Sequence, residues 1–314
     1  MTATAPLGTY YPAASKTTGP ILAATDRTDE SLSALRAAKV LNESLHVGVT
    51  VLAVIEPLPL IVPEPSSLLQ PLVITPELTA VVREQAIKQI KEIGADPDTW
   101  IVDVEDGRPA EEIARAARAL GASLVVLGLS HHGLVDRLID GDTALDLLRD
   151  SSTPVLLASK EFLSLPRRAL VAVDFSPESM AAARIGLGLL SPDCLLYLAH
   201  VRPEVTIFDG SGLWEEEYER VASEQLENFK QTLAAPVTMR VETTILNGKP
   251  AKALTDFANA INADLIVSGS HGTGLMRRIF IGSTASRLLR KTDRSILIVP
   301  ARTDEQSSEG ALSQ

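Results

Sequence analysis

Short apolar runs alternate with amphipathic segments along most of this chain. In the C-terminal half, the apolar run 169–174 precedes an Ala- and Leu-rich segment, 179–190, whose apolar positions recur with a helical period. A second apolar run, 195–201, precedes the charged and helix-periodic segment 214–233. This alternation predicts a parallel sheet, because buried strands separated by helices are typical of sheets covered on both faces.

The same half continues with three more strands and two more helices. They are predicted at 239–246 (strand), 252–261 (helix), 264–268 (strand), 284–291 (helix) and 296–299 (strand). The first half repeats this order between Ile21 and Leu157, so each half is expected to contain five strands with four helices between them.

An internal repeat relates the two halves. Gly107-Arg-Pro-Ala matches Gly248-Lys-Pro-Ala at an offset of 141 residues. Across 107–159 and 248–300, roughly a third of the positions are identical without a gap. Matching blocks in the same order indicate duplication, and the chain is therefore expected to contain two α/β domains.

The expected organisation is a pair of domains between two polar tails. In order, the segments are an N-terminal tail at 1–19, a first domain at 20–160, a second domain at 167–301 and a C-terminal tail at 302–314. The N-terminal tail lacks the basic start and apolar stretch of a signal peptide. The longest apolar region, 47–62, is broken by a glutamate and two prolines and is too short to span a bilayer.

The first half carries extra residues at 56–79. Six prolines stand there among Leu, Ile and Val. So many prolines are expected to prevent regular structure, while the apolar content is unusual for a free linker. Two interpretations stay open: a flap packed on its own domain, or an exposed apolar surface that contacts a partner or lipid.

Charge and cysteine content narrow the classes of partner. The 314 residues include 29 basic and 40 acidic side chains, a formal net charge of −11. This leaves no excess of cations to replace counterions on a nucleic acid or to dock on an anionic membrane. Cys194 is the single cysteine and is expected to begin a buried strand. It cannot form an intrachain disulfide, which fits a cytoplasmic protein.

The candidate chemistry lies where the predicted strands of the second half end. Asp174 ends the first strand, and the fourth strand leads into Gly269 and Gly272, followed by Gly282-Ser283 at a helix start. Glycines let backbone N–H groups approach an anion, and a helix N-terminus favours phosphate. Asp174 would accept hydrogen bonds from ribose hydroxyls or help to hold a divalent metal beside the phosphates. The pattern predicts a phosphate site that is neither a P-loop nor a GxGxxG site.

Together, the repeat and the pattern G-x2-G-x9-G-S resemble the universal stress protein domain, present in tandem over about 20–300. The resemblance implies ATP in the C-terminal domain, with Mg²⁺ or Mn²⁺, in a stress-response protein. It implies two Rossmann-like domains of the adenine nucleotide alpha hydrolase-like class, each a five-stranded parallel sheet in the order 3-2-1-4-5 with helices on both faces. It also implies a homodimer through the terminal strand, 296–299.

The resemblance assigns ten residues of the second half to the nucleotide. They are Ala172, Asp174, Val201, Ser268, Gly269, His271, Gly272, Gly282, Ser283 and Thr284. Val201 is expected to contact adenine through its backbone, as the valine at this place in the family does.

The first half departs from the motif at two positions. His131 replaces Gly272, and Asp142 replaces Ser283, so a carboxylate stands where a phosphate would lie. The other positions keep their residue type or a similar one: Gly128, Gly141, Asp26 and Ile55, the last taken as the counterpart of Val201. We expect this half to bind no triphosphate tightly.

The remaining polar residues predict little catalysis. The neighbours His131 and His132 are interpreted as a solvated loop pair, and His200 as packing at a strand end. Arg277 and Arg278 are interpreted as a solvated face or as contacts to the γ-phosphate or to a second subunit. No base for hydrolysis is apparent, so at most weak ATP hydrolysis is expected. The alternatives are a slow metal-dependent ATPase and a non-nucleotide interaction protein that uses 56–79.

Overall fold

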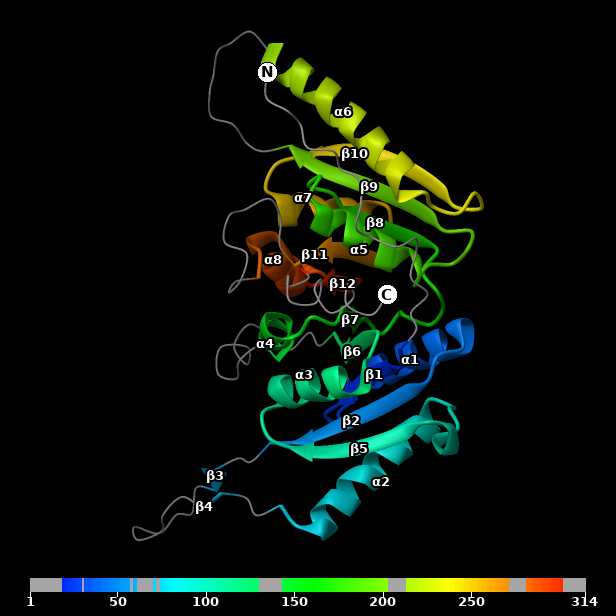
Figure 1. Cartoon of the computed structure of the whole chain (residues 1–314), viewed down its shortest axis with the longest axis vertical. Helices are drawn as coiled ribbons and strands as arrows, with labels where there is room; N and C mark the ends of the chain where they lie inside the picture. The colour runs from blue at the N-terminus through cyan, green and yellow to red at the C-terminus, as the bar shows by residue number, and fades with distance from the viewer. Residues whose placement is uncertain are drawn as a thin grey trace, which may run out of the picture.

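The computed structural model describes residues 19–29, 31–56, 59–60, 70–71, 74–129, 143–202, 213–270 and 281–301. The first half contains β1 (Ile21–Thr25), α1 (Leu32–Leu45), β2 (Val49–Ile55), β3 (Pro59–Leu60), β4 (Gln70–Pro71), α2 (Pro76–Glu92), η1 (Pro97–Thr99), β5 (Ile101–Asp106), α3 (Pro109–Leu120), β6 (Leu124–Gly128), α4 (Thr143–Asp150) and β7 (Val155–Ala158) (Figure 1). The second half contains β8 (Arg168–Ala172), α5 (Pro177–Leu187), β9 (Leu195–Arg202), α6 (Leu213–Leu233), β10 (Arg240–Asn247), α7 (Pro250–Ala260), β11 (Leu265–Gly269), α8 (Ser283–Lys291) and β12 (Ser295–Val299).

The repeated Gly-x-Pro-Ala sequence is the turn from strand to helix in both halves. Gly107 and Gly248 have positive φ angles, +142° and +109°, that favour glycine. Two residues later, Pro109 and Pro250 begin α3 and α7, where a missing N–H costs no helical hydrogen bond. The duplicated motif therefore fixes how each third strand leads into its helix.

One ten-stranded sheet runs through both halves. Its order is β10-β9-β8-β11-β12-β7-β6-β1-β2-β5. Within each half, and leaving out the separate strands β3 and β4, the strand order along this sheet is 3-2-1-4-5. In this sheet, all pairs within a half are parallel. The prediction of two parallel α/β domains is confirmed.

The two halves meet through their last strands. β12 pairs with β7 in the antiparallel sense, with Leu297 opposite Leu156. The junction continues one residue past the end of β7, where the buried Ser295 hydroxyl of β12 accepts from the Ser159 N–H at 3.0 Å and lies 3.0 Å from the Ser159 hydroxyl. The expectation that strand 296–299 forms the contact of a homodimer is wrong, because both edges of β12 are already paired within the chain.

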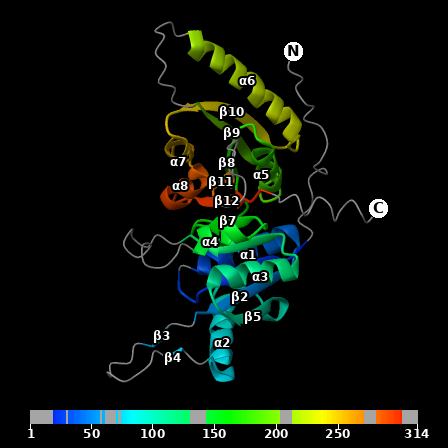
Figure 2. The ribbon, with the colours of Figure 1, turned by 60° about the vertical axis from the view of Figure 1, so that its left-hand side comes forward.

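Helices cover both faces of the sheet. One core cluster joins α1, α2, α5 and α6 to alternate strand residues, and a second joins α3, α4, α7 and α8 to the intervening ones. In the second half, α7 and α8 lie on one side of the strands and α5 on the other (Figure 2). Each cluster is continuous across the junction, so the halves share their apolar core.

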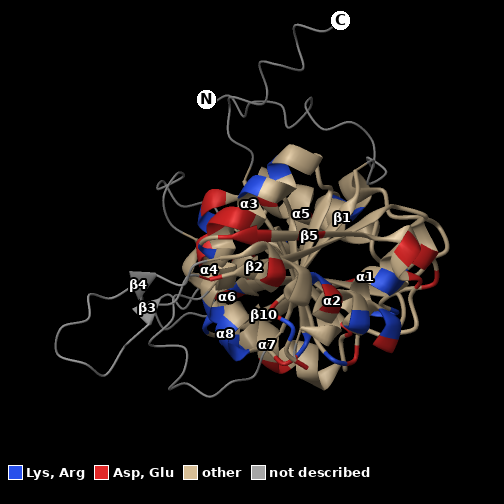
Figure 3. Ribbon diagram, turned by 90° about the horizontal axis from the view of Figure 1, so that it is seen from below, with Lys and Arg blue, Asp and Glu red and all other residues tan. Residues whose placement is uncertain are grey.

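Charged residues lie mainly on the outer elements. In the view of Figure 3, acidic and basic positions are interspersed over the helices. Charged residues of α6 form ion pairs on its surface: Arg220 contacts Glu217 and Glu224, each at 2.6 Å. Because these side chains are exposed, such pairs contribute little to the stability of the fold.

The proline-rich segment 56–79 contains some regular structure. Pro59 pairs with Pro71, and Leu60 with Gln70, in the two-stranded sheet of β3 and β4. Pro76 begins α2, where proline is favoured. The expectation that prolines prevent regular structure is therefore wrong for these residues. Both interpretations of the segment, flap or partner surface, depend on residues outside the described ranges.

No helix within the described ranges is long and apolar enough to span a membrane.

Candidate functional site

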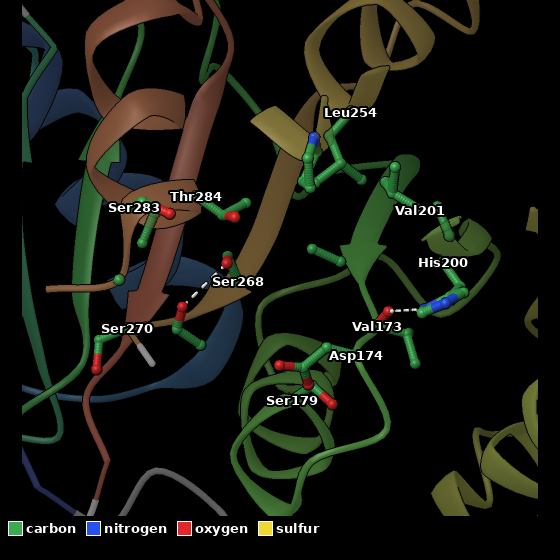
Figure 4. Close-up of a pocket in the computed structure, with 16 residues that line it drawn as sticks. Val173, Asp174, Ser179, His200, Val201, Leu254, Ser268, Ser270, Ser283 and Thr284 are labelled. Atoms are coloured by element: carbon green, nitrogen blue, oxygen red, sulfur yellow. Dashed lines mark hydrogen bonds between the residues drawn. The ribbon is translucent and has the colours of Figure 1, made fainter. Parts of the chain in front are cut away.

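A pocket of about 410 Å³ opens at the carboxyl ends of β8, β9 and β11 (Figure 4). The helix that follows β8 covers one face of the sheet, and the helix that follows β10 covers the other. Open parallel sheets bind ligands at such a point. Its size is typical of small-molecule sites. The lining residues are Ala172, Val173, Asp174, Ser179, Ala199, His200, Val201, Pro250, Leu254, Ser268, Gly269, Ser270, Gly282, Ser283, Thr284 and Ala285.

Eight of the ten residues predicted for the nucleotide line this one pocket. They are Ala172, Asp174, Val201, Ser268, Gly269, Gly282, Ser283 and Thr284. The other two, His271 and Gly272, lie outside the described residues, as do His131, His132, Asp142, Arg277 and Arg278. Several lining residues escaped the sequence analysis, above all Ser179, Ser270, Ala199, Pro250 and Leu254. The Gly-x-Pro repeat was the signal for the last two, because it sets the start of α7.

Backbone hydrogen bonds hold the two parts of the glycine motif together. After β11, the Ser270 N–H donates to the Val299 carbonyl at 2.8 Å. The Ser270 carbonyl then accepts from the Gly282 N–H at 2.7 Å. The Ser270 side chain is completely buried, and its hydroxyl accepts from the Ala301 N–H at 3.2 Å. Residues 269–270 are therefore held beside the start of α8, although they lie far apart in the sequence.

The N-terminus of α8 faces the pocket without a side-chain cap. Gly282 is the N-cap residue and has no side chain to accept from the helix. The first helical hydrogen bond runs from the Ser286 N–H to the Gly282 carbonyl at 3.0 Å. The N–H groups of Ser283, Thr284 and Ala285 therefore have no acceptor within the helix, and these three residues line the pocket. Such a helix end attracts anions.

Asp174 stands just beyond the end of a strand. It was predicted to end the first strand, but β8 ends at Ala172. The Asp174 carboxylate accepts from the Ser176 N–H at 3.0 Å and from the Ser176 hydroxyl. Between them, Phe175 has a left-handed φ of +63°. Figure 4 shows the carboxylate between the Ser268 and His200 sides of the pocket. This local turn ends the strand earlier than the apolar run indicates.

The first half repeats this turn. Asp26 accepts from the Thr28 N–H at 2.9 Å and from the Thr28 hydroxyl at 2.6 Å. Arg27, between them, has a φ of +69°. An Asp-x-Ser/Thr turn after the first strand is thus common to both halves, and the sequence carries a signal for it in the repeated Asp-x-Ser/Thr pattern.

His200 is the buried polar side chain on the β9 wall, 8% exposed. Its Nδ1 lies 2.8 Å from the Val173 carbonyl, which can only accept, so Nδ1 carries the proton. Nε2 then accepts from the Tyr218 hydroxyl of α6 at 2.7 Å. The Phe175 ring packs on the imidazole with centroids 4.4 Å apart. Burial lowers the pKa of His200, which keeps the ring neutral.

The charge of the described lining is low. Asp174 is its acidic residue, and it includes no Lys or Arg. Within the described ranges, no group of three or more His, Cys, Asp or Glu residues is arranged to hold a metal ion. Hydroxyl groups and backbone N–H groups gather at the α8 end, and apolar side chains such as Leu254 line the α7 side. The pocket suits a ligand with an anionic end and a flat apolar end.

The counterpart of Val201 in the first half differs from the expectation. In the sheet, Arg202 pairs with Asn247 and Ile55 pairs with Asp106, each pair just before the glycine of the repeat. Val54, rather than Ile55, therefore corresponds to Val201. The expected match was wrong by one residue, because the spacing upstream of the repeat is uneven, and such a slip points a side chain to the opposite face.

Sequence comparisons give strong matches over both halves. The Universal stress protein family model matches residues 17–159 and again 166–300. A universal stress protein of Mycolicibacterium smegmatis is 27% identical over 297 residues, covering 90% of this chain and 97% of that protein. A universal stress protein of Methanocaldococcus jannaschii is 29% identical over 160 residues, covering 46% of this chain and 94% of that protein.

Solved structures share the fold. The crystal structure of a universal stress protein from Archaeoglobus fulgidus covers 93% of this chain and 99% of its own, with a TM-score of 0.63 and 21% identity. A functionally unknown protein from Pseudomonas aeruginosa covers 96% of this chain and 100% of its own, with a TM-score of 0.64 and 17% identity. With the family model matched in both halves, this chain belongs to the universal stress protein family and carries its domain twice.

Proposed function

We propose that this universal stress protein binds ATP in the pocket of its second half and acts as a cytoplasmic, stress-response regulatory protein. One observation carries the proposal: Asp174, Val201 and the described part of the glycine–serine motif line a single pocket at the carboxyl end of the sheet. These residues come from the ends of three strands and from the start of a helix. Their proximity in the folded chain therefore does not follow from proximity in the sequence.

The α8 end of the pocket fits the phosphates. Three backbone N–H groups without helical acceptors and the hydroxyls of Ser283 and Thr284 lie there. The Gly282 position leaves room for close approach of the ligand to the backbone. The acidic residue of the described lining, Asp174, comes from a different element, β8–α5. A polyanion would therefore meet donors and a favourable helix dipole at this end.

The β8–β9 end fits the nucleoside. Asp174 would accept hydrogen bonds from the ribose hydroxyls, and the Val201 backbone would contact the base. Ala172, Ala199 and Leu254 supply apolar surface for a flat ring. A divalent cation bound with ATP would take most of its ligands from phosphate and water oxygens, because Asp174 is the carboxylate of the described lining. We propose at most slow hydrolysis.

The first half is proposed to bind no triphosphate tightly, because Asp142 would repel it. A homodimer of this chain would use a surface other than β12.

Two glycines at equivalent positions of the repeat test the proposal. Nucleotide released from denatured protein is identified by chromatography, and apo protein is titrated with ATP by calorimetry. Gly282→Val places a branched side chain at the uncapped start of α8 and is expected to abolish binding, whereas Gly141→Val in the first half leaves one site of unchanged affinity. Wild-type protein that binds no adenine nucleotide overturns the proposal. Equal effects of the two substitutions overturn its assignment to the second half.

A further inference from the structure

His200 makes hydrogen bonds to two elements beside the proposed nucleotide site. One ring nitrogen donates to the Val173 carbonyl, and the other accepts from Tyr218 of α6. The sequence pattern indicated only packing for this side chain. Its contacts reach both residues that flank Asp174, Val173 and Phe175.

The first consequence concerns the backbone of Val201. The ladder between β8 and β9 ends with the Val173 N–H donating to the Ala199 carbonyl at 2.8 Å. Alternate residues of a strand turn their backbone groups to the same side, so Val201 faces β8 as Ala199 does. The Val173 carbonyl would be the next acceptor, but the His200 ring donates to it instead. Val201 therefore turns its backbone groups toward the pocket that it lines.

The second consequence concerns Asp174. The hydrogen bond from His200 holds the residue before it, Val173, and ring packing holds the residue after it, Phe175. Phe175 keeps a left-handed φ of +63°, a conformation that surrounding contacts must hold in a residue with a side chain. The imidazole thus restrains the turn that presents the Asp174 carboxylate.

The third consequence concerns α6. Tyr218 donates to His200, and its neighbour Glu219 lies 3.7 Å from Arg202. His200 and Arg202 alternate with Val201 along β9, so their side chains lie on the α6 side of the strand and that of Val201 lies on the other side. The seating of α6 and the shape of the pocket therefore depend on the same short stretch of β9.

The first half shows that the fold does not require this pair. By the strand register, Ala53 occupies the position of His200 and is completely buried. Alanine can make neither hydrogen bond. There, the buried Gln89 amide accepts from Thr25 at 2.7 Å and donates to the Thr28 carbonyl at 2.9 Å. The corresponding β–α unit of the first half is thus held together by different contacts. Of the two halves, only the second, which contains the proposed site, has the imidazole at this position.

We infer that His200, oriented by Tyr218, is a positioning residue for the nucleoside part of the ligand. It ends the β8–β9 ladder so that the Val201 backbone is open to the base, and it holds Asp174 toward the ribose. Nucleotide binding and the docking of α6 are thereby coupled. This inference rests on the proposed ATP function of the same pocket.

Conservative variants separate positioning from general destabilisation. Tyr218→Phe removes only the hydroxyl that orients the ring, and His200→Phe keeps an aromatic ring without either hydrogen bond. His200→Asn retains an amide N–H near the place of Nδ1. Gln89→Leu removes the buried polar contacts of the first half and is the matched control.

The measurement is calorimetric titration of the full chain with ATP, ADP and AMP at pH 7.5, with folding of each variant checked by urea denaturation. Tyr218→Phe and His200→Phe are expected to raise all three Kd values by the same factor, about five- to twentyfold, because the lost contacts serve the nucleoside. His200→Asn recovers most of the affinity, and Gln89→Leu leaves it unchanged. Added ATP slows amide hydrogen exchange in α6 of wild type but not of Tyr218→Phe.

The outcomes separate this inference from the function on which it rests. If wild type binds ATP and both aromatic variants bind it equally well, the inference alone is overturned. An equal loss in Gln89→Leu also overturns it, because the effect would then be general destabilisation. If wild type binds no adenine nucleotide, the proposed function fails, and this inference fails with it.

Discussion

Exchanging Ser283 for aspartate would give the second half the residue that the first half carries as Asp142. Ser283 is the first residue of α8 and lines the pocket at the proposed phosphate end. If a bound phosphate lies about 5 Å from a carboxylate there, Coulomb's law with an effective dielectric constant of about 20 gives about 3 kcal/mol of repulsion per pair of unit charges. This corresponds to a loss of affinity of about a hundredfold.

The same substitution should leave the fold intact. A carboxylate in the first turn of a helix stabilises it by about 0.3–1 kcal/mol, so the free energy of unfolding is expected to stay level or rise. Calorimetric titration with ATP, ADP and AMP measures affinity, and urea denaturation measures stability. The loss should be largest for ATP and smallest for AMP, since the repulsion grows with the charge near α8.

A control isolates the charge. Ser283→Ala removes the hydroxyl without adding a carboxylate and is expected to cost about tenfold or less in affinity for ATP. Two results would refute the reasoning: an unchanged Kd for ATP in Ser283→Asp, or an equal loss for ATP and AMP. Either would mean that the phosphates do not lie at the start of α8.

Three further predictions follow from buried groups. Burial raises the pKa of the Cys194 thiol to about 12, so a thiol reagent at pH 8 should label it only after urea unfolds the chain; rapid labelling of the native protein contradicts this. The pKa of His200 is lowered by burial below its ordinary 6.5, so the unfolded chain binds more protons on acidification, and stability should fall as the pH drops through about 6.5. That dependence should be weaker in His200→Phe, and identical pH profiles would count against it. Ser295→Ala leaves the buried Ser159 N–H without its acceptor and should lower the free energy of unfolding by about 1–3 kcal/mol, whereas an unchanged urea midpoint would show that the contact is dispensable.

Local pattern was enough to predict the elements, and the family resemblance assigned eight of the sixteen residues that line the candidate pocket. Apolar runs and helical periods identify the strands and helices of the second half because each element buries one face. The Gly-x-Pro repeat identifies the turns, since a left-handed glycine and a proline at the first helical position have few alternatives. The eight assigned residues meet in one pocket because the carboxyl ends of parallel strands share one edge.

Contacts between residues that lie far apart in the chain could not be predicted from the sequence. The pairing of β12 with β7 could not be read from strand 296–299, because an apolar strand does not reveal which edge it joins. His200 gave no sign of Tyr218, which is 18 residues away on another element. The exact end of β8 depends on a side-chain turn at Asp174 and on the left-handed Phe175, which apolar periodicity does not register.

The antiparallel join of β12 and β7 has an evolutionary consequence. When two identical chains assemble, every substitution appears in both sites, so neither site can change alone. Here the short segment between β7 and β8 joins the two halves, so each half is at a high effective concentration beside the other. Their association therefore does not weaken on dilution. Each half is then free to acquire its own substitutions. With Asp142 in one half and Ser283 in the other, the expected response is a single, non-cooperative saturation curve rather than the paired response of a symmetric dimer.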